Sequence, residues 1–193
     1  MGPTAHPYFN LEGEKRVRSR STHPGQRRVR RTARIFACFS QVMRARATLT
    51  PAMRSGVRGE VRFVDSGGRY MDVLFDVTGL RPGKHGVHVH NENLRHAGDP
   101  CSVACDHYNP TGDEHGSATS LRRHRGDMGN IVAGHDGSCR TKVRVLCSVN
   151  EIVGKIVVVH AGEDDLGLGS TPSSKVNGNA GAKVACGFIL REV

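Results

Sequence analysis

The sequence beyond residue 56 predicts an all-β domain. Short segments in which apolar and polar residues alternate recur along it, and such alternation is typical of half-buried strands. The chain of 193 residues contains 24 glycines, few aromatic residues and no tryptophan, a composition that favours many turns over a helical bundle. Its length accommodates one domain with its own core, together with a tail.

The first two predicted strands form a hairpin. Residues 60–64 and 71–77 alternate apolar and polar side chains, and Gly67-Gly68 between them is typical of a hairpin turn. A turn cluster follows at residues 79–83. The same pattern predicts further strands at residues 86–90, 130–132, 140–145, 155–160 and 184–190.

The positive charge of the chain is concentrated near its N-terminus. The formal net charge is +10, yet Lys15 to Gly59 contains 13 Lys or Arg residues and no acidic residue. From Glu60 onward there are 15 basic and 16 acidic residues. We therefore expect residues 1–41 to be a basic, largely disordered extension and residues 42–193 to form the domain.

Several roles of the extension stay open. The first alternative is a solvated tail without a partner. The second is a segment that binds nucleic acid or another polyanion through clusters such as Arg27-Arg28-Val29-Arg30-Arg31. The third is an Arg-rich organelle-targeting segment, and the fourth is a stretch that precedes a true start at Met43 or Met53. The apolar stretch Ile35 to Phe39 is too short for a secretory signal, and no run reaches transmembrane length. We expect a cytoplasmic protein without a membrane partner.

Six histidines and one aspartate have spacings that indicate a metal site. Two of them form a His-x-His pair on a predicted strand, where both rings point to one face because side chains alternate. Four others fall between residues 91 and 129, an aperiodic segment, and long ordered loops often carry function. Imidazole is a common ligand of copper and zinc, and a nearby carboxylate suits zinc better. The seven residues are His88, His90, His107, His115, His124, Asp127 and His160.

The motifs around these residues carry a family resemblance. They are His88-Val89-His90, His107-Tyr108-Asn109-Pro110, His115-Gly116, Arg123-His124-Arg125-Gly126-Asp127, Val158-Val159-His160, Asp164-Asp165-Leu166-Gly167 and Gly178-Asn179-Ala180-Gly181. In order and approximate spacing they resemble the copper–zinc superoxide dismutases, over roughly residues 56–193. The resemblance implies an eight-stranded Greek-key β-barrel or sandwich with two long functional loops. Residues 42–55 would supply its first strand, which Pro51 and several arginines predict to be weak or at an edge.

The resemblance also implies a site with a copper ion and a zinc ion. The copper ligands would be His88, His90, His107 and His160. The zinc ligands would be His107, His115, His124 and Asp127, with His107 as the bridge between the two ions. Asp164 resembles the carboxylate that links one ligand histidine of each metal, and His85 resembles a histidine that packs inside the barrel and binds no metal.

The implied activity is the dismutation of the superoxide anion. Copper would take an electron from one superoxide, releasing dioxygen, and reduce a second to hydrogen peroxide, while His107 takes up and returns a proton. The family usually has Arg where this chain has Lys183, and Lys keeps the charge but lacks the planar fork that guides a small anion. Only Lys175 is charged within residues 169–177. We therefore expect a reduced rate. The alternative is a catalytically weak homologue that binds metal or a copper chaperone and acts by sequestration.

A disulfide and an oligomeric state follow from the same resemblance. Cys101 and Cys186 match the disulfide of the family, and closing this loop would stabilise the fold by about 4.5 kcal/mol. Cys105 is a neighbour that competes for Cys186. A homodimer is expected over a monomer, although Arg95-His96 and Arg191-Glu192 are costly in an apolar interface.

Overall fold

The computed structural model describes residues 42–92 and 98–193, which belong to one compact unit. The expectations of disorder, targeting and polyanion binding for residues 1–41 lie outside the described residues, as does Arg95-His96. No helix in the described ranges has the length and apolar character needed to cross a membrane.

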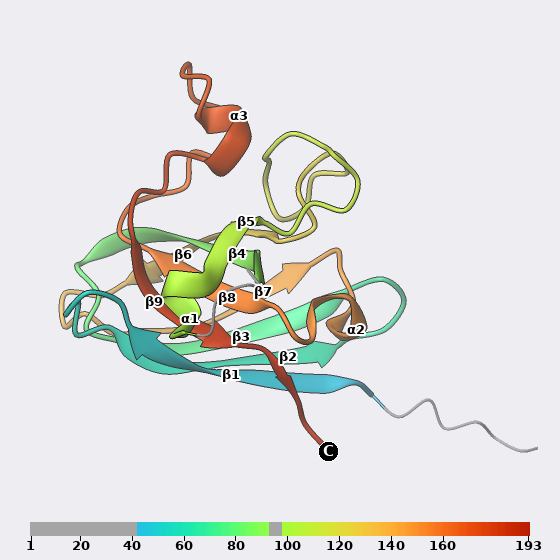
Figure 1. Ribbon diagram of the computed structural model, residues 1–193, viewed down its shortest axis with the longest axis horizontal. Helices are drawn as coiled ribbons and strands as arrows, with labels where there is room; N and C mark the ends of the chain where they lie inside the picture. The colour runs from blue at the N-terminus through green and yellow to red at the C-terminus, as the bar shows by residue number, and fades with distance from the viewer. Residues whose placement is uncertain (1–41, 93–97) are drawn as a thin grey trace, which may run out of the picture. The chain divides into compact units, whose positions relative to one another are not determined.

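Within these ranges the chain forms ten strands and three single-turn helices (Figure 1). The strands are β1 (Arg44–Pro51), β2 (Arg58–Asp65), β3 (Met71–Thr78), β4 (Gly83–Glu92), β5 (Ala104–His107), β6 (Asp127–Ala133), β7 (Cys139–Val145), β8 (Ile156–His160), β9 (Lys183–Phe188) and β10 (Leu190–Arg191). The helices are α1 (Pro100–Val103), α2 (Val149–Ile152) and α3 (Ser174–Asn177). The predicted all-β class is confirmed.

The eight longer strands form one curled antiparallel sheet. They follow the order β6-β4-β8-β9-β1-β2-β3-β7, in which many neighbours are distant in sequence, as in a Greek key. No hydrogen-bonded ladder joins β6 to β7 among the described residues, so backbone hydrogen bonds do not close the curled sheet into a complete barrel between these two strands. The inward side chains of the curl, including Phe63, Val73 and Val87, are fully buried and form the core.

The predicted hairpin is confirmed as β2 and β3. These strands pair along their whole length, and the turn glycines Gly67 and Gly68 have φ of 96° and 62°. The predicted strand at residues 184–190 is interrupted at Ile189. Its backbone instead exchanges hydrogen bonds with the turn before β8, from Ile189 N to the Lys155 oxygen (2.8 Å) and from Gly154 N to the Ile189 oxygen (2.9 Å). The interruption separates β9 from β10.

The expectation of a weak or edge first strand is wrong. β1 lies inside the sheet between β2 and β9. Its alternate residues Ala45, Ala47 and Leu49 are buried, so its arginines point outward and leave the core apolar. Pro51 is the last residue of the strand, where its missing N–H removes no interior ladder bond.

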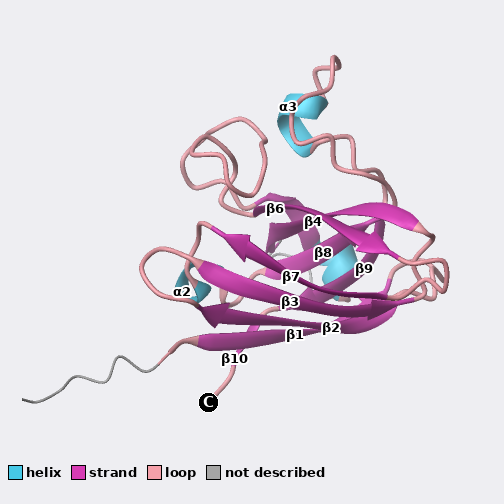
Figure 2. Ribbon diagram, turned by 180° about the vertical axis from the view of Figure 1, so that it is seen from behind, coloured by secondary structure: helices cyan, strands magenta, loops and turns pink. Residues whose placement is uncertain are grey.

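The disulfide and the two long loop segments surround one end of the sheet. Cys101 and Cys186 are bonded, with their Cα atoms 5.2 Å apart, and this bond attaches α1 to β9. The loop after β5 and the loop that carries α3 lie on the same side of the sheet (Figures 1 and 2). Each of these loops begins where a strand ends, at His107 of β5 and at His160 of β8.

Candidate metal centre

A first group of four buried histidines lies on three neighbouring strands. His88 and His90 project from β4, His107 ends β5, and His160 ends β8. His90 lies directly opposite His107 in the β4–β5 ladder. One nitrogen of each ring lies within 4.8 Å of one nitrogen of every other ring. Sheet pairing thus brings together the four residues that the sequence indicated.

The hydrogen bonds of the rings decide which nitrogen faces the centre of the first group. His90 Nδ1 donates to the Cys105 oxygen (2.6 Å) and His160 Nδ1 donates to the Gly181 oxygen (3.0 Å). Their Nε2 atoms are therefore free and face each other at 3.4 Å. His88 is turned the other way: its Nε2 is hydrogen-bonded to Asp164, and its buried Nδ1 has no hydrogen-bond partner among the described residues. Unpartnered lone pairs that converge in this way suit a metal ion.

A second group is centred on the carboxylate of Asp127. Its Oδ1 lies 2.9 Å from His107 Nδ1, 3.0 Å from His115 Nδ1 and 3.4 Å from His124 Nδ1. The Nδ1 atoms of His107 and His124 are 3.3 Å apart. Tetrahedral bonds of about 2.0 to 2.1 Å to zinc would separate the donors by about 3.3 Å. Three nitrogens and one carboxylate oxygen at these spacings fit zinc.

A ring nitrogen of His88 also lies within 4.8 Å of ligand atoms of His107, His115 and Asp127 in this second group. We assign His124 rather than His88 to the second group, since His124 Nδ1 is within 3.4 Å of both Asp127 and His107. His107 is then the residue that both groups share.

Asp164 connects the two groups from behind. Its carboxylate accepts from His88 Nε2 (2.9 Å) and from His115 Nε2 (2.7 Å). The backbone of Asp164 is held by Asn130, whose amide exchanges two hydrogen bonds of 2.8 Å with it. These contacts place a proton on Nε2 of each ring and so direct each Nδ1 atom toward the centre of its group.

Two residues that support the site were not assigned a role from the sequence. The guanidinium of the buried Arg123 donates to the carbonyl oxygens of His124 (2.6 Å) and Asp127 (3.2 Å) and to that of Leu146 (2.6 Å). It thereby ties the loop of two ligands to the segment after β7. Gly178 has a φ of 65°, and a Cβ at this position would overlap Asp164 Oδ1 and His115 Nε2. Both lie in the motifs noted above, but only tertiary contacts reveal what they do.

Burial keeps the first group neutral. It lowers the pKa of His88 to about 3 and that of His160 to about 4, and it lowers the pKa of His90 and His107 as well. Neutral imidazole is the form that binds metal, so these four rings are ready for a metal ion at pH 7 without losing protons.

The second group behaves differently because it contains carboxylates. Burial opposes the charged form of His115, but the carboxylates of Asp127 (3.0 Å from Nδ1) and Asp164 (2.7 Å from Nε2) outweigh it and raise the pKa of His115 to about 9. Burial likewise opposes ionisation of Asp127 and Asp164, yet their histidine partners lower the pKa of both carboxyls below the usual range. Metal bound at His115 Nδ1 would therefore displace a proton.

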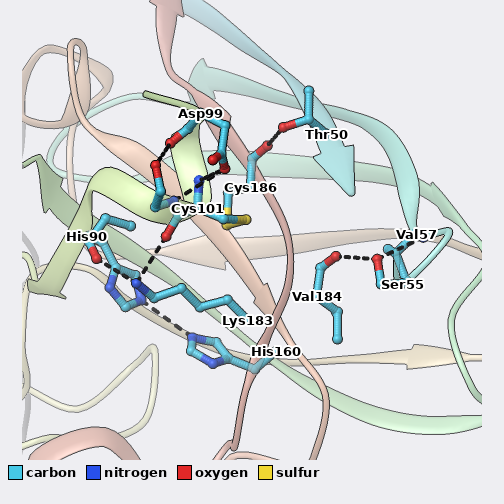
Figure 3. Close-up of a disulfide and its surroundings, with 12 residues drawn as sticks. Thr50, Ser55, Val57, His90, Asp99, Cys101, His160, Lys183, Val184 and Cys186 are labelled. Carbon is cyan, nitrogen blue, oxygen red and sulfur yellow. Dashed lines mark hydrogen bonds between the residues drawn. A yellow bond between two sulfur atoms is a disulfide. The ribbon is translucent and has the colours of Figure 1, made fainter. Parts of the chain in front are cut away.

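A cleft of about 940 Å³ opens onto the first group. Its lining includes His90, His107, His160 and Lys183. The Lys183 ammonium donates to the carbonyl oxygens of Cys101 (3.3 Å) and Ala104. Figure 3 shows this side chain between the disulfide and the rings of His90 and His160. Other charged residues of the lining are Asp99, Asp106, Asp113, Glu114 and Lys175.

His85 contacts backbone carbonyl oxygens with both ring nitrogens. Its Nδ1 lies 2.8 Å from the His160 oxygen and its Nε2 lies 2.8 Å from the Arg81 oxygen, so both ring nitrogens are occupied.

A protein-family model described as copper/zinc superoxide dismutase (SODC) matches residues 57–189 of the chain. The match contains every residue of both groups, together with Asp164, Lys183 and the two disulfide cysteines.

Proposed function

The chain belongs to the copper/zinc superoxide dismutase family, and we propose that it converts superoxide to dioxygen and hydrogen peroxide. The ring of His107 carries this proposal. Its Nδ1 faces Asp127 in one group, and its other side faces His88 and His90, with ring centroids 4.0 Å and 4.8 Å away. An imidazole shared by two sets of metal ligands suits this reaction, because the reaction needs both a redox-active ion and a group that carries a proton beside it.

We assign copper to His88, His90, His107 and His160, and zinc to His107, His115, His124 and Asp127. The donor sets support these assignments, since the second contains the carboxylate and the tetrahedral spacings that zinc favours. When bound, copper supplies the one-electron redox couple and zinc holds one side of His107 without changing its oxidation state.

His107 Nε2 is the atom that would hold and release a proton during turnover. Its Nδ1 is committed to the second group beside Asp127, so Nε2 is the ring atom on the side of the cleft. A proton released from this atom toward the cleft would reach the peroxide product.

Lys183 would hold the superoxide anion beside the first group. An ammonium has three N–H donors, and two of them are used by the carbonyl oxygens of Cys101 and Ala104. One donor remains for an anion, whereas a guanidinium has five N–H donors and would retain more. Four carboxylates against two lysines in the cleft lining further disfavour the approach of an anion. We therefore propose a rate lower than that of a Lys183→Arg variant.

The test uses the full chain loaded with both metals. We expect one copper and one zinc per chain and catalysed loss of superoxide, measured directly by rapid mixing or pulse radiolysis. Lys183→Arg should raise the rate constant, and Lys183→Ala should lower it. Lys84→Arg is the matched control, because Lys84 is exposed and pairs with Glu163 away from the cleft. Full occupancy by both metals without superoxide loss above that of the buffer would refute the enzymatic function.

That same outcome would support a second candidate, a homologue that binds copper without fast turnover and acts by sequestration. The acidic lining of the cleft favours it, because carboxylates attract a metal cation and repel superoxide. Tight copper retention against a chelator, with no turnover, distinguishes it. Capture of a copper chaperone would belong to this second function.

A further inference from the structure

One face of the sheet carries a surplus of positive charge away from the metal centre. β1, β2, β3 and β7 lie side by side (Figure 2), and their inward side chains are buried while their outward ones face solvent. We call these outward side chains the outer face. Its cations are Arg44, Arg46, Arg58, Arg62, Arg140, Lys142 and Arg144, and its carboxylates are Glu60, Asp72 and Asp76.

Strand register sets the cations in rows across the outer face. Arg46 pairs with Arg62, and Leu74 of β3 separates Arg62 from Lys142. In the next row, Arg44 and Arg144 occupy the two outer strands. Since neighbouring strands lie about 4.8 Å apart, each row spans about 14 Å.

The carboxylates of the outer face are already neutralised by neighbouring cations. Glu60 pairs with Arg62, Asp76 with Arg140 (3.1 Å), and Asp72 with both Arg144 (2.9 Å) and Lys142 (3.3 Å). Arg44, Arg46 and Arg58 have no ion-pair partner in the part of the chain that the structure describes. The surplus is therefore about four positive charges, most of them along β1 and β2.

A groove of about 720 Å³ runs in the outer face. Arg62 and Glu60 line one side, Arg140 and Lys142 line the other, and Leu74, Asp76 and Thr78 of β3 lie between them. The two sides are two strand spacings apart, about 9.6 Å. None of the residues that line the groove lines the cleft of the metal centre.

We propose that the outer face binds the phosphate backbone of nucleic acid without reading its sequence. Arg44, Arg46 and Arg58, which have no ion-pair partner among the described residues, supply the surplus cations that complement a chain of phosphates. The outward positions of these four strands carry no aromatic side chain that could stack on a base.

The experiment measures binding of the full chain to a fluorescently labelled 20-base-pair DNA duplex of mixed sequence by anisotropy, between 50 and 200 mM salt. The outer-face variant combines Arg46→Gln, Arg58→Gln and Lys142→Gln. The control removes the same charge from exposed positions elsewhere, with Arg81→Gln, Lys84→Gln and Arg122→Gln. Equal metal content and equal thermal stability show that both variants are folded.

We expect the outer-face variant to bind the duplex at least tenfold more weakly. Its slope of log K against log salt should fall by about 2.7, because about 0.9 counterion is released for each phosphate that a side chain neutralises, and three such side chains are removed. The control should change affinity less than twofold. Equal losses in the two variants would show that only net charge matters, and would overturn the proposal. Binding to a sulfated polysaccharide that depends on the outer face, with no binding to the duplex, would also overturn it.

Discussion

Replacing Asp164 by Asn should weaken the binding of both metals. The carboxylate accepts from His88 Nε2 (2.9 Å) and His115 Nε2 (2.7 Å), one ring from each group, and from the backbone N–H of Leu166 (2.7 Å). An amide of the same size has one acceptor oxygen and a donor NH2. One of the two rings would therefore meet a donor and turn away from the geometry that aims Nδ1 at the metal.

The magnitude follows from the hydrogen bonds that the amide cannot make. A hydrogen bond to a charged group contributes about 1.5 to 3 kcal/mol, and Asp164 is almost fully buried, so solvent cannot replace it. Removal of one such bond corresponds to about a tenfold to 150-fold change in an equilibrium constant. Loss of a residue that orients metal ligands typically costs about 10- to 100-fold in metal affinity. We expect zinc and copper affinities to fall within this range.

The assay is competition between metal-free protein and a chromogenic chelator, with each metal titrated separately. Asp165→Asn is the matched control: Asp165 is the adjacent carboxylate, and it accepts from Ser174 Oγ (2.8 Å) and Asn179 Nδ2 (2.6 Å) rather than from a histidine. Its metal affinities should stay within about threefold of the unchanged protein. If both variants lose affinity equally, the loss reflects disturbance of the loop, and the bridging role of Asp164 is wrong.

Three further predictions concern pH, the disulfide and a glycine. Metal-free protein should lose stability as pH falls from about 6.5 toward 3. In the unfolded chain the histidines take up protons near pH 6.5, whereas in the folded protein His88 and His160 have pKa values of about 3 and 4. A melting temperature that stays constant from pH 7 to 4.5 would contradict this prediction. Replacing Cys101 and Cys186 together by Ser should lower the free energy of unfolding by about 4.5 kcal/mol in urea titrations, because the disulfide closes a loop of 85 residues in the unfolded chain. A change below about 1 kcal/mol would contradict the chain-entropy explanation of this stabilisation. Gly178→Ala should lower zinc affinity in the chelator assay, whereas Gly112→Ala, which also has positive φ but open space around it, should not.

Much of the fold could be predicted because its signals are local. The alternation in residues 60–64 and 71–77 and the glycines between them define a hairpin within one short segment. β1 was placed wrongly because its arginines and Pro51 are also local signals, typical of an edge. Its true position depends on pairing with β9, more than 130 residues away, which local pattern does not reveal.

The candidate site divides in the same way. Residue types and motif spacing were enough to indicate the six histidines and Asp127, and the family resemblance implied Asp164 and the cysteine pair; the structure brings all of them together. The roles of Arg123 and Gly178 could not be predicted, because each acts through atoms that the fold brings near. An arginine beside a ligand motif is equally compatible with a solvated side chain.

Residue order alone was enough to predict the fold class and the residue types of the metal centre, because strand periodicity and motif spacing can be read directly along the chain. The pairing of Cys101 with Cys186 was implied by the family resemblance of those motifs. The folded arrangement was needed to show which nitrogen of each ring is free, how Lys183 uses its donors, and where the surplus charge of the sheet collects. The difference arises from separation along the chain: His88 and Asp164 are 76 residues apart, and packing alone brings them to 2.9 Å.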